Sequence, residues 1–176
     1  VGPNQSHTAW TRLDVVVTTA SWMGTDTTLG WNVPFAEQDE DLWPAVLQVG
    51  VTSIFSLLKR AAPHLAATGN GSVVLLSSIY GFGAPQPDMY RETGINNIAG
   101  YAASKGAVSQ LARWLATTLA PEVRVNSISP GGVFRNQDPA FVERYSERTP
   151  LARMATEDDI AGPVLFLASD LSRYIT

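Results

Sequence analysis

The chain has 176 residues, of which 45% are hydrophobic and 16% are charged, and its formal net charge is -4 at pH 7. This length and composition favour one globular domain over residues 1–176, with residues 1–10 expected to be loose. The negative charge, with no dense Lys/Arg patch, argues against nucleic-acid binding, and the absence of cysteine excludes disulfides and thiolate metal sites.

Strand-like and helix-like segments alternate along the chain. In order, we expect a buried strand over 13–19, a loop over 20–38, a helix over 39–67, a strand over 72–78, a loop over 79–100, a helix over 101–120, a strand over 123–128, a short helix over 140–148, and a helix that follows a capping box at 156–159 and runs to about 168. The strands are short, β-branched and nearly continuous in apolar character, as in buried parallel strands. The sequence therefore predicts an α/β fold with about three parallel strands and flanking helices, whose first strand is an apolar edge that needs a partner.

Targeting, membrane and metal signals are not apparent in the sequence. No signal peptide is visible. We expect that no apolar run reaches the roughly 18 residues that a membrane helix needs, and we therefore predict no membrane contact. His7 and His64 are too isolated for a metal site, so no metal is predicted. The lack of cysteine agrees with a reducing, cytoplasmic compartment.

The main chemical motif is a Tyr-Ala-Ala-Ser-Lys run. It places Tyr101 and Lys105 four residues apart, on one face of the helix expected over 101–120. An ammonium group beside a phenol favours the phenolate, so Lys105 is expected to lower the pKa of Tyr101 from about 10. Such a phenol is a proton donor for carbonyl chemistry. A Ser-Ser pair at 77–78 ends the second strand, and Pro-Gly-Gly at 130–132 follows the third.

Together these motifs resemble the short-chain dehydrogenase/reductase family. The resemblance runs from about 13 to 176 and rests on Tyr-x-x-x-Lys, the Ser-Ser pair, and Val-Arg-Val-Asn-Ser-Ile-Ser-Pro-Gly-Gly over 123–132. It implies a partial Rossmann-like, doubly wound parallel sheet in three α/β/α layers. It also implies an oxidoreductase that uses NAD or NADP and transfers hydride to or from a small-molecule carbonyl or alcohol substrate.

The resemblance also implies residue roles. Tyr101 would be the general acid/base, Lys105 would tune it and hold the nicotinamide ribose, and Ser78 would hydrogen-bond the substrate oxygen. The implied cofactor contacts are Ala20, Lys105, Pro130, Gly131, Gly132 and Val133. Each has a structural alternative: a tyrosine packed on the sheet, a solvated lysine, a serine that ends a strand, and a simple turn.

Several positions depart from the family pattern. No glycine-rich dinucleotide fingerprint precedes the strand over 13–19, and that strand ends in Thr-Thr-Ala-Ser at 18–21 where the family has Asn-Asn-Ala-Gly. Gly50 stands where the family has an asparagine that relays protons, and Gln48 and Thr52 point to other faces. These departures favour the alternative of a non-catalytic remnant or structural subunit unable to bind cofactor alone. A degenerate binding module for a sugar-like ligand is a third, weaker interpretation.

The loop between Ser78 and Tyr101 is longer than the family usually has. We hypothesise that it shapes a polar, sugar-like substrate site. Arg91 in this loop is a candidate for binding a carboxylate or phosphate, against the alternative that it pairs with Asp88 or Glu92. The resemblance also implies a homo-oligomer, a dimer or tetramer, that packs through the helices over 39–67 and 101–120.

Overall fold

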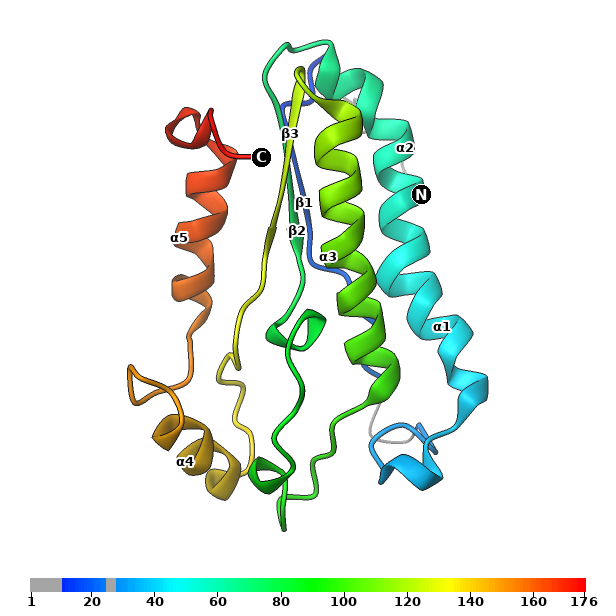
Figure 1. The fold of residues 1–176 in the computed structure, drawn as a ribbon, viewed down its shortest axis with the longest axis vertical. Coiled ribbons are helices and arrows are strands. Elements are labelled where there is room, and N and C mark those ends of the chain that lie inside the picture. The colour runs from blue at the N-terminus through cyan, green and yellow to red at the C-terminus, as the bar shows by residue number, and fades with distance from the viewer. Residues whose placement is uncertain (1–10, 25–27) are drawn as a thin grey trace, which may run out of the picture.

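A single parallel sheet of three strands forms the centre of the fold (Figure 1). The computed structural model describes residues 11–24 and 28–176, so the expectation for residues 1–10 lies outside the described part. The strands are β1 (Val15–Thr18), β2 (Gly71–Leu76) and β3 (Val123–Ile128), in the order β1-β2-β3. Val16 pairs with Val73, which in turn pairs with Val125. Since all strands run the same way, their carboxyl ends share one edge.

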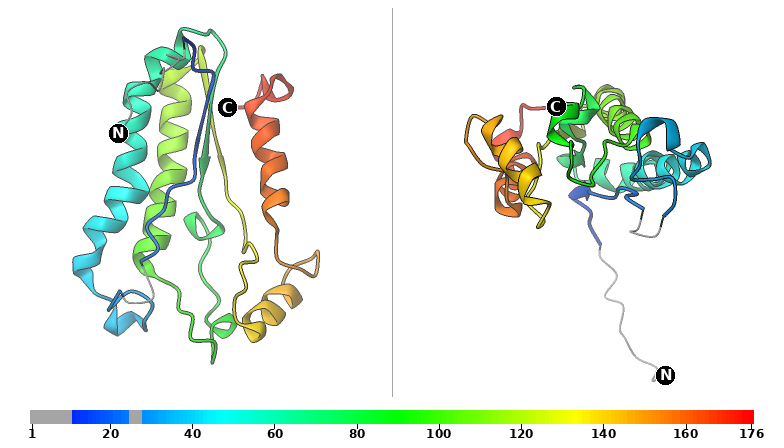
Figure 2. Two further views of the ribbon diagram at one scale, coloured as in Figure 1. Left: turned by 180° about the vertical axis from the view of Figure 1, so that it is seen from behind. Right: turned by 90° about the horizontal axis from the view of Figure 1, so that it is seen from below.

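Helices cover both faces of this sheet (Figures 1 and 2). On one face, a continuous helical run lies beside α3 (Ala99–Leu119). The run consists of η2 (Glu40–Leu42), α1 (Trp43–Leu47), the π-helical η3 (Gln48–Thr52) and α2 (Ser53–Ala66). On the other face lies α5 (Glu157–Ala168), and α4 (Pro139–Glu147) lies beyond the carboxyl ends of the strands. The predicted three-layer, Rossmann-like α/β arrangement is confirmed.

Short 3-10 helices occur in the two long loops and after α5. They are η1 (Phe35–Glu37), η4 (Ile79–Gly81), η5 (Pro87–Met89) and η6 (Asp170–Ser172). The predicted bounds of the main helices and strands agree with the observed ones to within a few residues.

The apolar core lies between the sheet and the pair α2 and α3. Alternate residues of a strand point to opposite faces, so Val73 and Leu75 of β2 both face these helices. They pack with Leu58 and Leu65 of α2 and Val108 of α3, and all five side chains are buried. Burial of each such side chain stabilises the fold by about 1.5–3 kcal/mol.

The opposite face of the sheet is covered differently. None of the residues of α5 is buried, and Leu165 is 68% exposed. Polar side chains of the sheet hold the helix: Ser72 Oγ donates to the Leu167 carbonyl at 2.8 Å, and Arg124 Nη2 donates to the same oxygen at 3.2 Å. Arg124 Nη1 also donates to Ser172 Oγ at 2.9 Å. The α5 layer is thus attached by directional hydrogen bonds.

The start of α5 shows the predicted capping box. The Thr156 backbone N–H donates to Asp159 Oδ2 at 2.8 Å, in the reciprocal arrangement that satisfies two free N–H groups at a helix start. Arg153 forms an ion pair with the same carboxylate at 2.5 Å. The hydrogen bond from Arg153, followed by those from Thr156, holds the pKa of Asp159 well below its usual range.

The helical run Glu40–Ala66 is long and apolar enough, by length and composition, to cross a membrane. The expectation that no apolar run reaches this length is therefore wrong. Its apolar residues lie on two faces: Ile54 and Leu58 are buried against the sheet, whereas Phe55 and Leu57 are exposed. The buried face is that of a core helix, and it accounts for part of the apolar character of this run.

Candidate active site

The carboxyl ends of the three strands open onto one cavity of about 530 Å³. The segments that follow β1, β2 and β3 all contribute to its wall, together with the start of α3 and residues of α4. Its lining residues are Thr19, Ser21, Met23, Ser77, Ser78, Ile79, Tyr80, Tyr90, Tyr101, Lys105, Pro130, Gly131, Gly132, Val133, Arg135, Gln137, Phe141, Tyr145 and Met154. In a parallel α/β sheet, ligands bind at this edge.

Ser78 lies directly after β2, as the cap of η4. Its Oγ accepts a hydrogen bond from the Tyr80 backbone N–H at 3.2 Å, which fixes the turn that begins there. The next residue, Ile79, donates its N–H to the Pro130 carbonyl at 3.0 Å. The turn after β2 is thereby tied to the loop after β3, and the two segments form adjacent parts of the cavity wall.

A buried polar contact fixes α3 against this turn. Ser77 Oγ donates to the Lys105 carbonyl at 2.8 Å and lies 2.7 Å from Ser109 Oγ. A Cβ atom at Gly81 would lie 2.7 Å from Ser77 Oγ and 2.8 Å from the Lys105 carbonyl oxygen. Only glycine therefore allows the turn to approach α3 this closely. This contact sets the position of the helix that carries Tyr101 and Lys105.

Lys105 is 5% exposed, and its amino group points back toward the sheet. Nζ donates to the Leu76 carbonyl at 2.8 Å and lies 5.6 Å from the centroid of the Tyr101 ring. Burial lowers the pKa of Lys105 below its ordinary value. Because an ammonium group has three donors, two remain for a ligand in the cavity.

The pKa of Tyr101 is raised above its ordinary value of 10.0. Burial is the largest cause; the hydrogen bond with Ser78 lowers the pKa, and the proximity of Tyr90 raises it. The expectation that Lys105 holds this pKa below its ordinary value is therefore wrong for the structure as it stands. The amino group of Lys105 lies over the ring and does not offset the burial of the phenol. Tyr101 is accordingly a neutral proton donor at neutral pH.

The Pro-Gly-Gly segment forms a close-fitting wall. A Cβ atom at Gly131 would lie 2.6 Å from the Tyr145 hydroxyl, and one at Gly132 would lie 2.7 Å from the Met154 methyl carbon. The Gly132 N–H donates to the Tyr145 hydroxyl at 2.5 Å. Val133 forms a parallel bridge with Ala155. The backbone here lines the cavity with no side chain in the way.

One predicted cofactor residue is placed differently. Ala20 is exposed and does not line the cavity, whereas its neighbours Thr19 and Ser21 do. Among the described residues, the buried hydroxyls of Thr18 and Ser21 have no hydrogen-bond partner. The free donors of Lys105 and the backbone at 131–132, which carries no side chain, suit the ribose and the nicotinamide ring of a coenzyme, and the buried, unpartnered hydroxyl of Ser21 belongs to a residue of the same wall.

The structure also shows the surroundings of Gly50, which stands where the family has an asparagine, and of Arg91, the candidate anion-binding residue. Gly50 is buried, and a Cβ atom there would lie 3.3 Å from Ser104 Cβ, so the position faces α3 with no side chain to offer. Gln48 and Thr52 are exposed whereas Gly50 is buried, which agrees with the prediction that they point to other faces. Arg91 is exposed and bonds to Asp88 at 2.7 Å outside the cavity, which agrees with the alternative interpretation of that residue.

Sequence reasoning assigned no role to three aromatic side chains of the cavity. They are Tyr80, Phe141 and Tyr145, of which Phe141 lies 5.8 Å from Tyr145 and 5.5 Å from Tyr90 between ring centroids. The i,i+4 spacing of Phe141 and Tyr145 on α4 is a signal for a shared face. No local signal links α4 to the loop after β2.

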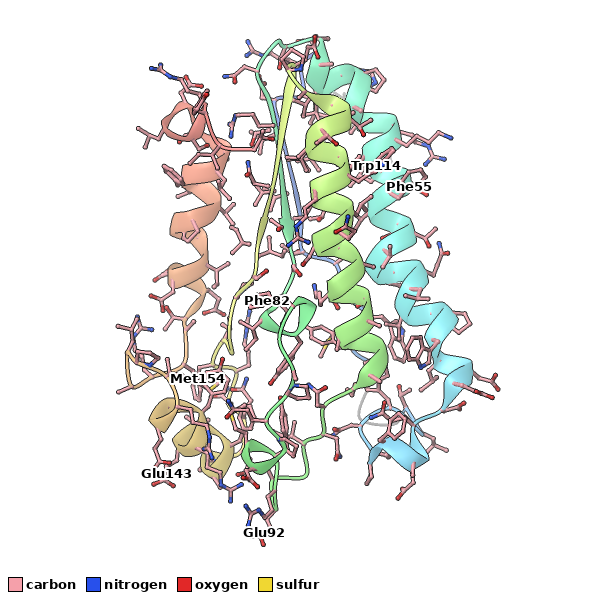
Figure 3. The ribbon with its side chains drawn as sticks, viewed as in Figure 1. Phe55, Phe82, Glu92, Trp114, Glu143 and Met154 are labelled. Carbon is pink, nitrogen blue, oxygen red and sulfur yellow. The ribbon has the colours of Figure 1, made fainter. Side chains whose placement is uncertain are left out.

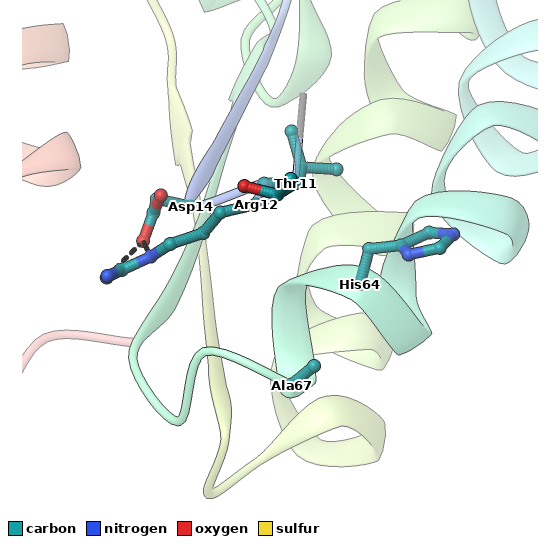
Figure 4. Close-up of a pocket in the computed structure, with 6 residues that line it drawn as sticks. Thr11, Arg12, Asp14, His64 and Ala67 are labelled. Atoms are coloured by element: carbon teal, nitrogen blue, oxygen red, sulfur yellow. Dashed lines mark hydrogen bonds and ion pairs between the residues drawn. The ribbon is translucent and has the colours of Figure 1, made fainter. Parts of the chain in front are cut away.

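A second hollow lies at the far end of β1 and α2 (Figure 4). Thr11, Arg12, Asp14 and His64 line it, and Arg12 pairs with Asp14 at 2.6 Å. It contains none of the predicted site residues. Within 11–24 and 28–176, no group of three His, Cys, Asp or Glu residues is arranged to hold a metal ion.

A parallel sheet between two helical layers, with Ser78, Tyr101 and Lys105 gathered at its carboxyl edge, is characteristic of a Rossmann-like α/β protein. The chain belongs to the short-chain dehydrogenase/reductase family. A family model described as enoyl-(acyl carrier protein) reductase matches residues 4–176. The chain is 33% identical over 172 residues to a sorbose reductase from Schizosaccharomyces pombe, a match that covers 94% of this chain and 61% of that protein.

Solved structures give the same family. A short-chain dehydrogenase from Leptospira borgpetersenii with bound NAD+ has a TM-score of 0.81 and 31% identity, over 93% of this chain and 60% of that one. A gluconate 5-dehydrogenase from Burkholderia cenocepacia in complex with NADP and tartrate has a TM-score of 0.75 and 25% identity, over 94% and 61%. The chain thus spans about three fifths of the length of these relatives.

Proposed function

We propose that this chain carries the catalytic residues of an NAD(P)-dependent oxidoreductase that interconverts a carbonyl and an alcohol. The observation that carries the proposal is the shared cavity at the carboxyl edge of the sheet. There the hydroxyl of Tyr101 meets that of Ser78, and Lys105 lies one helical turn further along α3. Relatives with bound NAD+ or NADP support the choice of coenzyme.

The residues divide the work in a simple way. When bound, the coenzyme supplies or accepts the hydride. Tyr101, a neutral phenol at neutral pH, donates its proton to the carbonyl oxygen during reduction, and Ser78 hydrogen-bonds the same oxygen as charge develops on it. The free donors of Lys105 hold ribose hydroxyls, and the bare backbone of Gly131 and Gly132 admits a flat ring.

We further propose a small, hydroxylated, sugar-like substrate. The cavity wall carries the hydroxyls of Ser78 and of four tyrosines and the amide of Gln137 beside apolar side chains such as Met23 and Val133, so it offers several hydrogen-bond partners to a ligand with hydroxyl groups. The similarity to a sorbose reductase and a gluconate 5-dehydrogenase supports the same substrate class.

A homo-oligomer, a dimer or tetramer, is the third part of the proposal. The neighbouring helices α2 and α3 both expose large apolar side chains, among them Phe55 and Trp114, which are labelled in Figure 3. Trp114 is 54% exposed, and Leu57 of α2 and Trp43 of α1 are also exposed. Exposed large apolar side chains on neighbouring helices are typical of subunit interfaces.

The test is NADH- or NADPH-dependent reduction of hydroxyacetone and L-sorbose by the purified chain, followed by coenzyme absorbance. Tyr101→Phe removes the proton donor and should lower kcat/KM by about 10²–10⁴-fold. Tyr174→Phe is the matched control because Tyr174 is fully exposed and outside the cavity. No turnover with either coenzyme, together with no coenzyme binding, would favour the non-catalytic subunit instead.

A further inference from the structure

Two tyrosine hydroxyls meet inside the cavity, on the wall next to Tyr101. Tyr80 belongs to η4, directly after Ser78, and Tyr90 follows η5 in the long loop before α3. Their hydroxyl oxygens form a short hydrogen bond in which either oxygen can be the donor. Both side chains line the same cavity as Ser78 and Tyr101. The long loop before α3 thus positions the Tyr90 hydroxyl, and η4 after β2 positions the Tyr80 hydroxyl.

Packing and a capped turn hold the two tyrosine side chains in place. The Tyr90 ring packs 5.5 Å from the Phe141 ring, and both belong to an apolar cluster with Met89 and Met154. Figure 3 shows Met154 between α4 and the loop after β3. Tyr80 is fixed by the turn that Ser78 caps. A hydroxyl pair fixed on both sides presents a rigid polar group to a ligand, with little conformational entropy to lose on binding.

Tyr80 is a neutral phenol in this pair. Burial, followed by the hydrogen bond with Tyr90, raises the pKa of Tyr80 far above its ordinary value. Tyr145 and Tyr101 raise it further, in that order, because both phenols lie nearby. Two hydroxyl groups that share one hydrogen bond keep one O–H donor and several lone pairs free. This set is complementary to another hydroxyl, which both donates and accepts.

The charges around the cavity favour a neutral ligand at this position. Among the described residues of the lining there is no Asp or Glu, and the cations are Lys105 and Arg135. Lys105 binds the Leu76 carbonyl, and Arg135 pairs with Glu157 at 2.6 Å. Lys105 is thus the one described lining cation without a carboxylate partner, and its remaining donors are assigned to the coenzyme ribose, so an anionic group beside Tyr80 and Tyr90 has no further cation to meet.

We propose that the Tyr80–Tyr90 pair binds a hydroxyl group of the substrate that lies next to the reacting carbonyl, whose oxygen Tyr101 and Ser78 engage. The pair is a specificity element that selects hydroxy ketones and polyols over simple ketones and alcohols. This inference rests on the proposed function, since the reacting carbonyl is the reference point. A substrate without that neighbouring hydroxyl would cover the free O–H of the pair without bonding it, which is unfavourable.

The test compares hydroxyacetone with butanone, two ketones of nearly equal size that differ in one hydroxyl group. The unaltered chain should show a kcat/KM at least about tenfold higher for hydroxyacetone, the effect of one satisfied buried hydrogen bond. In Tyr90→Phe and Tyr80→Phe, that ratio should fall toward one. Tyr174→Phe, the exposed control, should keep it. Circular dichroism and thermal unfolding establish that the variants are folded.

Binding is measured alongside turnover, by saturation-transfer NMR of the two ketones with the unaltered chain and each variant. Stronger binding of hydroxyacetone that is lost in Tyr90→Phe supports the inference. Equal binding of both ketones, or a preference that survives both substitutions, overturns it while leaving the proposed function intact. Absence of turnover together with a hydroxyl-dependent NMR signal would instead overturn the proposed activity and keep the binding site.

Discussion

The two faces of the sheet are held by different kinds of interaction. The face toward α2 and α3 is apolar and closely packed, with Leu65 and Val73 completely buried. The face toward α5 is held by hydrogen bonds from Ser72 and Arg124, while the helix itself contributes no buried residue. Ser78 follows β2, and Tyr101 and Lys105 lie on α3, so the geometry of these site residues depends on the apolar face. The site is therefore supported mainly by the face of the sheet that packs against α2 and α3.

The largest expected effect comes from a matched pair of leucines. Leu65→Ala removes a fully buried side chain from α2 and should lower the free energy of unfolding by about 2–5 kcal/mol. Leu165→Ala, on the exposed side of α5, should change it by less than about 0.5 kcal/mol. Urea unfolding followed by circular dichroism measures both. Equal losses in the two variants would mean that α5 is packed as tightly as α2.

A pair of glycines extends the comparison. Gly81→Ala forces a methyl group against Ser77 Oγ and the Lys105 carbonyl, so it should destabilise the chain by about 1–3 kcal/mol. Gly162→Ala, inside α5 with nothing within 4 Å of the added Cβ, should stabilise it by about 0.5–1 kcal/mol. Thermal unfolding of the two variants should give shifts of opposite sign. A neutral Gly81→Ala would show that the turn after β2 moves freely relative to α3.

Arg124 is the main polar attachment of the α5 layer. Arg124→Met keeps an unbranched apolar stem but removes the guanidinium and its bonds to the Leu167 carbonyl and Ser172 Oγ, with an expected loss of about 1–3 kcal/mol. Compared with the unaltered chain, Arg124→Met should accelerate amide hydrogen exchange more in α5 than in α3. Arg173→Met is the control, since Arg173 is exposed. Uniform acceleration over both helices would contradict an α5 layer held separately.

The smallest expected effect is a dependence on pH. The folded-state pKa of Tyr101 is raised, so between its unfolded value near 10 and its folded value only the unfolded chain loses the proton. Stability should therefore fall as pH rises above about 10, by less than about 1 kcal/mol per pH unit for this side chain. Tyr101→Phe should flatten this decline in urea unfolding at pH 9 to 11. An unchanged slope would show that the phenol is solvated.

Much of the fold follows from local pattern. The strand over 123–128 was predicted with both of its observed ends, and the Tyr-x-x-x-Lys spacing placed Tyr101 and Lys105 on one face of α3. Periodicity and turn residues act over a few positions, so they identify elements well. The π-helical turn over Gln48–Thr52 has no such local signal, because it arises where Gly50 packs against α3.

The finer features of the site depend on contacts between distant segments. Gln38 caps α3 by accepting a hydrogen bond from the Ala99 N–H at 3.1 Å, across a separation that no sequence pattern reveals. The contact of Tyr80 with Tyr90 depends on how the long loop folds back on the turn after β2. The pKa of Tyr101 also rises through burial, which depends on the surrounding tertiary structure rather than on the nearby lysine.

The most direct test of the account is a titration of the 176-residue chain with NADH and NADPH, followed by nicotinamide fluorescence. The account predicts saturable binding of one coenzyme, weakened in Lys105→Met, which loses the ribose donors, and unchanged in Tyr174→Phe. Binding that is equal in the unaltered chain and in Lys105→Met would contradict the assigned role of Lys105. No binding of either coenzyme at millimolar concentration would contradict a functional coenzyme site at this edge of the sheet.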